Sequence, residues 1–315
     1  MTGVYVTAAL PHDILSPLRD RFATEVWVGA GPVPRQTLEG VVRDVEGLLC
    51  MITENIDERL LSRAPNLRVV SQMAVGVDNI DLEACRRRGI RVGHTPGVLT
   101  ETVADTAFAL LCSIVRRLPE GEKVVRRGEW GPWSPDFLNG RVLHGTTLGI
   151  VGMGRIGRSV ARRARGFDME IVYTSRSSTG DDLARRLDLD ELLETANHVV
   201  LTVALTPETH HLISTRELIR MRPEAYLVNV SRGPVVDTGA LVAALRAGEI
   251  AGAALDVTDP EPLPRDHPLL DLPNCLVVPH IASSSLETRA DMARLAVQNL
   301  IAGLDGYDLP AAHGP

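Results

Sequence analysis

The sequence predicts an α/β protein made of two open domains, each with a doubly wound parallel sheet. The chain has 315 residues, more than the roughly 100 to 200 residues of a usual domain. Short apolar runs alternate with polar segments of helical length, which is the rhythm of strands and helices in α/β proteins. Most of these runs are apolar throughout, as expected for parallel strands that helices cover on both faces.

The first predicted domain begins near Gly3 and reaches Val92. Its predicted strands are VYVTA, EGLLCMI, LRVVSQM and IRVG. The basic run at residues 86–88 precedes a glycine and is typical of a solvated helix end. Residues 100–118 predict a further helix, with Thr100 as capping candidate, acidic residues early and two arginines late.

A second α/β series follows an irregular segment at residues 119–145. That segment concentrates three aromatic residues, Trp130, Trp133 and Phe137. From Thr146 the predicted strands are TTLGIVG, EIVYT, HVVLTVA, AYLVNV, AGAALDV and CLVVP. After residue 285 the pattern LETRADMARLAVQNLIAGL predicts a final helix. Periodicity alone does not assign this helix to either domain.

The composition favours a soluble cytoplasmic protein that binds neither membranes nor nucleic acid. No uncharged stretch approaches the roughly 20 residues of a membrane span, and a secretory signal is not recognisable at the N-terminus. The net charge of -7 is opposite to that of a nucleic-acid-binding face. Cys50, Cys85, Cys112 and Cys275 are too widely spaced for a zinc ribbon or a redox pair, so we expect buried, reduced thiols and no metal site.

A glycine-rich turn follows the predicted strand TLGIV and precedes a predicted helix. It consists of Gly152, Met153, Gly154, Arg155, Ile156 and Gly157. G-x-G-x-x-G is weak evidence alone, but a strand before it and a helix after it are the context of a dinucleotide-binding motif. Gly152 permits the tight turn, Gly154 lets the backbone approach a pyrophosphate, and Gly157 lets helix and strand pack closely. The alternative is a glycine turn without a ligand.

The end of the next predicted strand bears on the choice of cofactor. NAD-binding folds place an acidic residue there, on the ribose 2′-hydroxyl. This chain has Ser175, Arg176 and Ser177 instead. An arginine flanked by hydroxyls can hold a 2′-phosphate by charge-assisted hydrogen bonds. The sequence therefore favours NADP(H), with NAD(H) possible if Arg176 is only a solvated loop residue.

Three polar residues directly follow predicted strands in the second half of the chain: Arg232, Glu261 and His280. Ligands of open parallel sheets bind at the carboxyl ends of the strands, so these side chains can converge although they are distant in sequence. Each one alone is more often structural. Their joint position after a nucleotide motif favours a catalytic site.

The chain resembles the D-isomer-specific 2-hydroxyacid dehydrogenases over nearly its whole length, most strongly their glyoxylate/hydroxypyruvate reductase branch. The matching stretches are GLLCMITENID, MAVGVDNID, RVGHTPGVLTETVAD, RRLPEGEKVVRRGEWGPW, GIVGMGRIGRSVARR, NVSRGPVVD, ALDVTDPEPLP, HPLL and PHIASSS. The resemblance implies a flavodoxin-like substrate domain at residues 1–97 plus 286–315. It also implies a Rossmann-type coenzyme domain at residues 98–285, with a dimerisation arm at about 119–145, and a homodimer.

The resemblance further implies roles for individual residues. Arg232 would bind the substrate's carboxylate and carbonyl, His280 would transfer a proton at the C2 oxygen, and Glu261 would favour the protonated imidazole. This agrees with the negative charge that develops on oxygen during ketone reduction. The backbone N–H groups of Val75 and Gly76 would hold the substrate carboxylate, and Trp133 would limit substrate size. Further cofactor contacts are implied for Val230, Ser231, Asp256 and Ala282.

The activity implied is the reduction of a small 2-keto acid such as glyoxylate or hydroxypyruvate to its 2-hydroxy acid. Two other readings remain open. One is a dehydrogenase for a longer 2-keto acid or for phosphite. The other is a dinucleotide-sensing binding protein on the same fold, because a fold alone does not fix a function.

Overall fold

The computed structural model describes residues 3–176 and 184–314, which form two compact units. Unit 1 comprises Met1–Leu99 and Ser285–Pro315, and unit 2 comprises Thr100–Ser284. Each unit contains one parallel sheet with helices packed against it.

Unit 1 contains a five-stranded sheet with the strand order β2-β1-β3-β4-β5. The strands are β1 (Gly3–Val6), β2 (Ala23–Val26), β3 (Gly47–Cys50), β4 (Val69–Gln72) and β5 (Arg91–Gly93). All pairs are parallel. The chain runs outward from β1 to β2 and then crosses to the other side for β3, which is the flavodoxin-like order.

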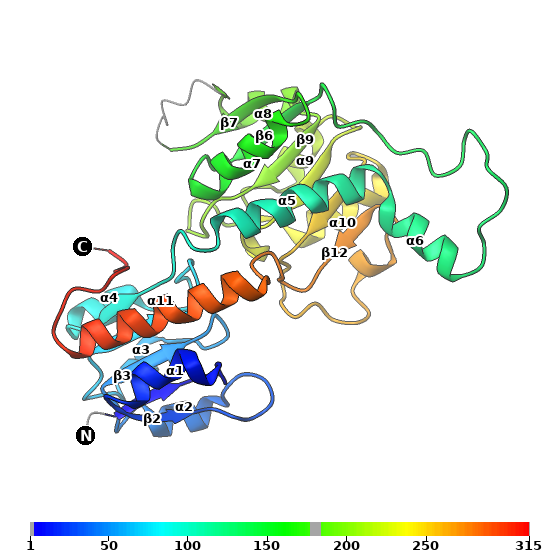
Figure 1. Ribbon diagram of the computed structural model, residues 1–315. Helices are drawn as coiled ribbons and strands as arrows, with labels where there is room; N and C mark the ends of the chain where they lie inside the picture. The colour runs from blue at the N-terminus through cyan, green and yellow to red at the C-terminus, as the bar shows by residue number, and fades with distance from the viewer. Residues whose placement is uncertain (1–2, 177–183, 315) are drawn as a thin grey trace. The chain divides into compact units, whose positions relative to one another are not determined.

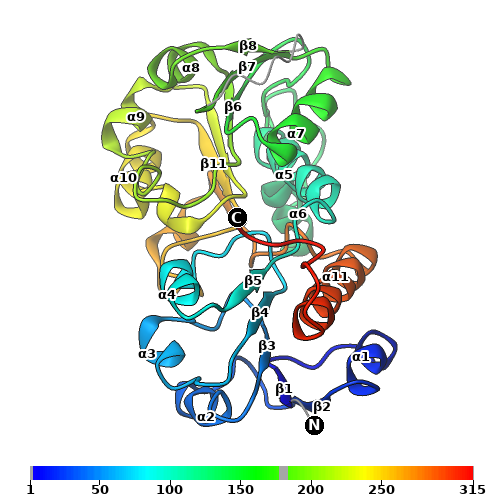
Figure 2. The same cartoon turned by 90° about the vertical axis from the view of Figure 1, so that its left-hand side faces the viewer.

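Helices cover both faces of this sheet, as Figure 2 shows. Helices α2 (Arg35–Val41), α3 (Glu58–Leu61) and α4 (Leu82–Arg87) lie on one face, and α1 (His12–Arg19) and α11 (Leu286–Leu304) lie on the other. The last helix contacts β3, β4, β5 and α1. Ser71 Oγ of β4 donates a 2.7 Å hydrogen bond to the Ala296 carbonyl of α11. This bond ties the C-terminal helix to the sheet that the N-terminal part of the chain forms.

Unit 2 contains a seven-stranded parallel sheet with the order β12-β11-β10-β9-β6-β7-β8. The strands are β6 (Thr147–Val151), β7 (Glu170–Thr174), β8 (Arg185–Arg186), β9 (His198–Leu201), β10 (Tyr226–Asn229), β11 (Gly252–Leu255) and β12 (Cys275–Val277). This is the Rossmann order. The strands β6, β7 and β8 are added toward one side of the sheet, and β9 to β12 are added toward the other side, starting next to β6. The predicted fold class, two doubly wound parallel sheets, is confirmed.

The helices of unit 2 flank the sheet (Figure 1). They are α5 (Thr100–Val115), α6 (Leu118–Arg126), α7 (Arg155–Arg165), α8 (Leu189–Thr195), α9 (Thr215–Arg220) and α10 (Thr238–Ala247), with short 3-10 helices η1 (Gly233–Val235) and η2 (Pro268–Asp271). Polar contacts fasten α7 to α5, since Ser159 Oγ donates to Glu101 at 2.7 Å and Arg163 pairs with Glu101 at 2.9 Å.

The carboxyl ends of six strands in unit 2 lie in one register row. Paired in order across the sheet, the residues of this row are Val277, Leu255, Asn229, Leu201, Val151 and Thr174. Any residue that directly follows one of these six therefore lies at the same edge of the sheet. We call this edge of unit 2 the carboxyl edge.

The helix predicted at residues 100–118 ends earlier than expected, and the segment after it is not wholly irregular. Helix α5 ends at Val115, and Arg117 has left-handed backbone geometry with φ of 54°. Its guanidinium pairs with Glu120 at 2.7 Å. Pro119 in the first turn then starts α6, which contains no buried residue. A proline suits that position because its missing N–H would have no helical partner there.

Thiol burial follows the prediction in part. Cys50 and Cys85 are buried, whereas Cys112 and Cys275 are half-buried, and all four are free thiols. Within residues 3–176 and 184–314, no helix is both long and apolar enough to cross a bilayer. The same residues contain no cluster of histidine, cysteine and acidic side chains with the arrangement of a metal site.

Candidate active site

The glycine turn begins at the carboxyl edge, directly after β6. Gly152 has φ of 104°, a region that other residues rarely adopt. Its N–H donates to the Thr174 carbonyl at 2.9 Å, and its carbonyl accepts from Thr202 Oγ1 at 2.6 Å. A Cβ at Gly157 would overlap the Gly152 carbonyl oxygen. Only glycine therefore lets α7 start this close to β6.

Space is left on the outer side of the same turn. A Cβ at Gly154 would meet no atom within 4 Å. Gly154 is also the N-cap of α7 and supplies no side chain to bond the first N–H groups of that helix. Unbonded N–H groups at a helix N-terminus, together with the helix dipole, attract anions. Met153 is buried beneath the turn, while Arg155 is exposed and Ile156 half-buried. The turn therefore fits a dinucleotide pyrophosphate.

Ser175 and Arg176 follow β7 at the same edge, half-buried and exposed, respectively. Ser177, the third residue predicted to contact the cofactor here, lies outside the described residues. A second cation, which the sequence prediction missed, stands nearby: Arg186 Nη2 of β8 donates to the Ser175 carbonyl at 2.8 Å. The Thr206 hydroxyl and the charge of Arg176 lower the pKa of Glu208, so an ionised carboxylate accompanies these arginines.

A buried amide shapes the loop after β10, where Val230, Ser231 and Arg232 lie. Asn229 Oδ1 accepts from the Ser231 N–H at 3.0 Å and from Ser231 Oγ at 2.6 Å. Asn229 Nδ2 donates to the Arg232 carbonyl at 2.9 Å. Val230 and Ser231 are buried, and the Arg232 side chain is half-exposed. Asn229 was not among the predicted site residues, although its position as the last strand residue could have indicated it.

A buried carboxylate likewise shapes the loop after β12. Asp256 accepts from the Ile281 N–H at 2.7 Å and from the Ala282 N–H at 3.1 Å. Burial raises the pKa of Asp256, although these two hydrogen bonds oppose the shift. Its main-chain carbonyl accepts from the His280 N–H at 2.8 Å. His280 has φ of 52°, strained for a side chain that is not glycine. Asp256 thus holds the backbone that presents His280.

The imidazole of His280 bonds directly to Glu261. Nδ1 of the ring lies 2.5 Å from Oε1 of the carboxylate, and the two side chains are 26% and 38% exposed. Burial raises the pKa of Glu261, but the hydrogen bond and charge of His280, with a contribution from the Arg232 guanidinium, outweigh it and lower the pKa overall. An ionised Glu261 accepts Nδ1–H and leaves Nε2 to face a ligand. The three predicted catalytic residues therefore form one charged cluster.

Other predicted site residues lie elsewhere. Val75 and Gly76 belong to unit 1, in the loop between β4 and α4, where both are half-buried. Trp133 belongs to the segment after α6 that projects from unit 2 (Figure 1), and 86% of its surface is exposed. Neither group is part of the carboxyl edge.

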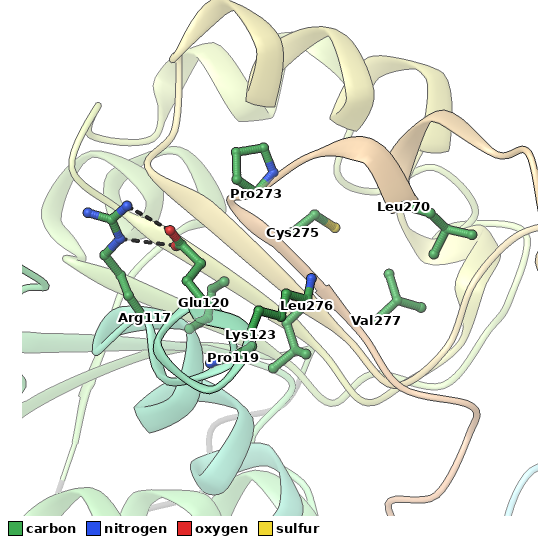
Figure 3. Close-up of a pocket in the computed structure, with 10 residues that line it drawn as sticks. Arg117, Pro119, Glu120, Lys123, Leu270, Pro273, Cys275, Leu276 and Val277 are labelled. Atoms are coloured by element: carbon green, nitrogen blue, oxygen red, sulfur yellow. Dashed lines mark hydrogen bonds and ion pairs between the residues drawn. The ribbon is translucent and has the colours of Figure 1, made fainter. Parts of the chain in front are cut away.

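A separate cavity of about 230 Å³ lies between α6 and β12. Figure 3 shows Pro119, Glu120 and Lys123 on one side and Cys275 of β12 on the other, with Arg117 paired to Glu120. None of the predicted catalytic or cofactor-binding residues lines it. The carboxyl edge, not this cavity, therefore contains the candidate active site.

Comparisons with known proteins agree with this geometry. A profile of the D-isomer specific 2-hydroxyacid dehydrogenase, NAD binding domain, matches residues 108–282. The glyoxylate reductase of Thermofilum pendens is 45% identical over 98% of this chain and 93% of its own length. A crystal structure of a Thermus thermophilus protein matches with a TM-score of 0.94 and 47% identity, covering 99% of this chain and 100% of that one.

A further solved structure contains a cofactor. It is the NADPH-dependent glyoxylate/hydroxypyruvate reductase of Sinorhizobium meliloti in complex with NADP and malonate. It matches with a TM-score of 0.87 and 34% identity, and the match covers 99% of this chain and 97% of that one.

Alanine at Gly154 and at Gly157 should separate ligand approach from packing. We expect Gly154→Ala to change the free energy of unfolding by less than about 1 kcal/mol, because the added methyl meets no protein atom. The same methyl should weaken binding of the nicotinamide dinucleotide, tested with both NADPH and NADH, by at least roughly tenfold by displacing the pyrophosphate. Gly157→Ala, in contrast, should lower the free energy of unfolding by about 1 to 3 kcal/mol, because its methyl overlaps the Gly152 carbonyl oxygen. Thermal unfolding and fluorescence titration measure both effects. Unchanged affinity for both dinucleotides in Gly154→Ala would contradict the assignment of the turn.

Proposed function

The chain belongs to the D-isomer-specific 2-hydroxyacid dehydrogenases, and we propose that it reduces glyoxylate or hydroxypyruvate to the corresponding 2-hydroxy acid. The observation that carries this proposal is the His280–Glu261 pair beside Arg232, at the same sheet edge as the glycine turn. Relatives named for glyoxylate and hydroxypyruvate reduction support the choice of substrate. The reaction is the reduction of a carbonyl carbon to CH–OH.

The residues of the carboxyl edge supply what this reduction requires of the protein. A bound nicotinamide dinucleotide supplies the hydride to C2 of the keto acid. His280 would give a proton to the C2 oxygen as negative charge develops there. Glu261 would hold the ring by Nδ1 and stabilise its charged form. The Arg232 guanidinium would pair with the substrate carboxylate and carbonyl oxygen.

The substrate carboxylate would also accept hydrogen bonds from the Val75 and Gly76 N–H groups. In this proposal residues 1–97 with 286–315 bind the substrate, and residues 98–285 bind the cofactor. Val230, Ser231, Asp256 and Ala282 would border the cofactor, since each lies at or just beyond the row of strand ends.

Removing the proton donor should abolish most of the activity. We expect His280→Ala to lower turnover of glyoxylate by roughly 100-fold or more, the usual contribution of a general acid, with NADPH affinity little changed. The measurement is NADPH oxidation followed by absorbance with glyoxylate, hydroxypyruvate, pyruvate and longer 2-keto acids.

Glu261→Gln is the matched variant, since it keeps the shape of the side chain but removes its charge. Without the carboxylate the Nδ1–H loses its charged acceptor and the ring is held less firmly, so turnover of glyoxylate should fall, with NADPH affinity little changed. Wild-type turnover in His280→Ala would disprove the assigned role. A wild-type protein that binds NADPH but reduces none of these acids would favour the dinucleotide sensor instead.

The cofactor is proposed to be NADPH in preference to NADH. Arg176 is exposed at the end of β7, where an acidic residue would bind the ribose of NAD. Arg186 adds a second guanidinium that contacts the Ser175 and Arg176 carbonyls. Two cations at this strand end favour a 2′-phosphate. The relative solved with NADP is named as NADPH-dependent, which supports the same preference.

Arg176→Ala should therefore discriminate between the two cofactors. We expect the KM for NADPH to rise by roughly tenfold or more, as the loss of a charge-assisted hydrogen bond predicts, while the KM for NADH changes little. Arg185→Ala is the control, because Arg185 lies on the same short strand as Arg186 but pairs with Glu170. Equal increases for both cofactors would show that Arg176 does not bind the 2′-phosphate.

The protein is proposed to form a homodimer through an arm at about residues 119–145. Large apolar side chains on this segment are exposed, namely Leu118, Val125, Trp130, Trp133, Phe137 and Val142. So dense a group of exposed apolar residues marks an interaction surface. A second copy of the chain would cover it, and Trp133 would then border the substrate of the neighbouring subunit.

Trp130→Ala and Trp133→Ala should distinguish a packing role from a role in specificity. We expect both variants to weaken the dimer, measured as molar mass by light scattering over a dilution series. Only Trp133→Ala should also raise kcat/KM for bulkier 2-keto acids relative to glyoxylate. An unchanged substrate profile would leave Trp133 with packing alone, and a monomeric wild type would rule out the dimer.

A further inference from the structure

Three consecutive main-chain carbonyls fix the loop that contains Val75 and Gly76. The Ala74 carbonyl accepts from the Thr95 N–H at 2.8 Å. The Val75 carbonyl lies 2.9 Å from His94 Nδ1, and the Gly76 carbonyl accepts from Gln72 Nε2 at 2.8 Å. Each carbonyl therefore points to a partner inside unit 1.

Peptide geometry turns these contacts into an orientation of the N–H groups. A peptide is planar, and in the trans form its N–H points opposite to its C=O. The bonds before Val75 and Gly76 are not among the cis peptides of the described chain. Fixing the Ala74 carbonyl thus orients the N–H of Val75, and fixing the Val75 carbonyl orients the N–H of Gly76. In residues 3–176 and 184–314 neither N–H has a hydrogen-bond partner.

Among residues 3–176 and 184–314, His94 is the one side chain that bonds the peptide group between Val75 and Gly76. A carbonyl oxygen can only accept, so Nδ1 of His94 must carry the proton. Donation to this carbonyl also polarises the peptide and makes its N–H a stronger donor, because hydrogen bonds in a chain strengthen one another. The imidazole therefore sets both the direction and the strength of the Gly76 N–H.

The C-terminal segment of the chain holds His94 in place. The His94 N–H donates to the Ala311 carbonyl at 3.0 Å, and the His94 carbonyl accepts from Asn299 Nδ2 at 2.9 Å. The ring of His313 packs edge-on against the His94 ring, with centroids 4.9 Å apart. The backbone on both sides of His94 is thus fixed by residues far away in the chain.

We propose that His94 is a positioning residue that aims the Gly76 N–H at the carboxylate of the 2-keto acid substrate, with residues 307–314 as its support. This inference rests on the proposed function, which gives the Val75 and Gly76 N–H groups that ligand. The contact is made equally in the ground state and the transition state. Its loss therefore raises KM and leaves kcat nearly unchanged.

Two substitutions at His94 test the proposal by kinetics. In His94→Leu the donor is lost, and KM for glyoxylate rises by roughly five- to tenfold, as one lost hydrogen bond predicts, with kcat within about twofold and KM for NADPH unchanged. In His94→Asn the amide Nδ2 can replace Nδ1, and KM returns to within about twofold of the wild type. Unchanged KM in His94→Leu, or no rescue by asparagine, overturns the proposal.

Arg91→Met is the matched control for a merely structural effect. Arg91 Nη1 donates to the Tyr307 carbonyl at 2.8 Å and so holds the same C-terminal segment, and among residues 3–176 and 184–314 no hydrogen bond joins Arg91 to Val75 or Gly76. We expect this variant to unfold at a lower temperature and to raise KM clearly less than His94→Leu does, because the imidazole can still donate to the Val75 carbonyl. A rise in KM equal to that of His94→Leu would show that loosening the segment is sufficient, which would also overturn the role of the imidazole.

A nuclear magnetic resonance experiment separates failure of this inference from failure of the proposed function. The sequence contains four Val–Gly pairs, at 28–29, 75–76, 92–93 and 151–152. Carbonyl-¹³C valine with ¹⁵N glycine therefore isolates the Val75–Gly76 peptide among four signals. We expect this signal to shift in His94→Leu and to return in His94→Asn, while the pairs at 28–29 and 151–152 stay in place.

The two results are read independently. A wild-type protein that reduces no 2-keto acid refutes the proposed function, and the Val75–Gly76 signal still decides whether His94 fixes this peptide. A signal that does not move in His94→Leu refutes the inference even when the enzyme reduces glyoxylate.

Discussion

The register of the parallel sheet in unit 2 is the constraint on which the candidate site depends. Six strands end in one row, so the glycine turn, the end of β7 and the loops after β10, β11 and β12 all begin at one edge. A slip of one residue in any strand would turn its side chains to the opposite face and shift its loop along the edge. Residues far apart in the chain meet because the buried apolar strands allow only one pairing.

Two buried polar residues fix the backbone of the loops that follow the strands. Backbone groups beyond a strand end lose their ladder partners, and each one left buried and unpaired is costly. Asn229 and Asp256 supply the missing partners through their side chains. The left-handed backbone of His280 persists because its own N–H and the next two are all bonded to Asp256. The backbone of Arg232 and of His280 is thus held by hydrogen bonds from the side chains and main chain of Asn229 and Asp256.

Local patterns were sufficient for the fold class and placed Arg232, Asp256 and His280 just beyond strand ends, but they did not indicate Asn229. Apolar runs identify buried strands, and a polar residue directly after such a run lies at a strand end. Helix α6 was not predicted in this way, because the pattern of residues 119–145 is irregular, whereas the structure starts a second helix after a break at Arg117. The break depends on the left-handed geometry of that residue and its ion pair with Glu120.

Contacts between distant segments were the other kind of information that the pattern lacked. Arg186 lies on a strand of two residues that contains no apolar residue, so periodicity gave no sign of it beside Ser175. The backbone of His94 is held by hydrogen bonds to Asn299 and Ala311, which are far away in the sequence. The resemblance to the family implied that the N–H groups of Val75 and Gly76 bind a substrate. It did not predict what holds them, because that depends on how the end of the chain packs against β5.

The charges of the catalytic cluster explain why a carboxylate accompanies the histidine. A guanidinium and an imidazolium alone would place two partly desolvated cations side by side, which is costly without a counter-charge. Glu261 reduces the sum of these charges to a single positive charge. Although burial raises the pKa of Glu261, the hydrogen bond and charge of His280 lower this pKa overall, which favours the ionised carboxylate. That single charge balances the one carboxylate of a 2-keto acid. A neutral residue at 261 would leave one positive charge in excess and would disfavour the proton that the reduction consumes. In the proposed mechanism the carboxylate of Glu261 therefore favours both a ligand with one negative charge and a protonated imidazole.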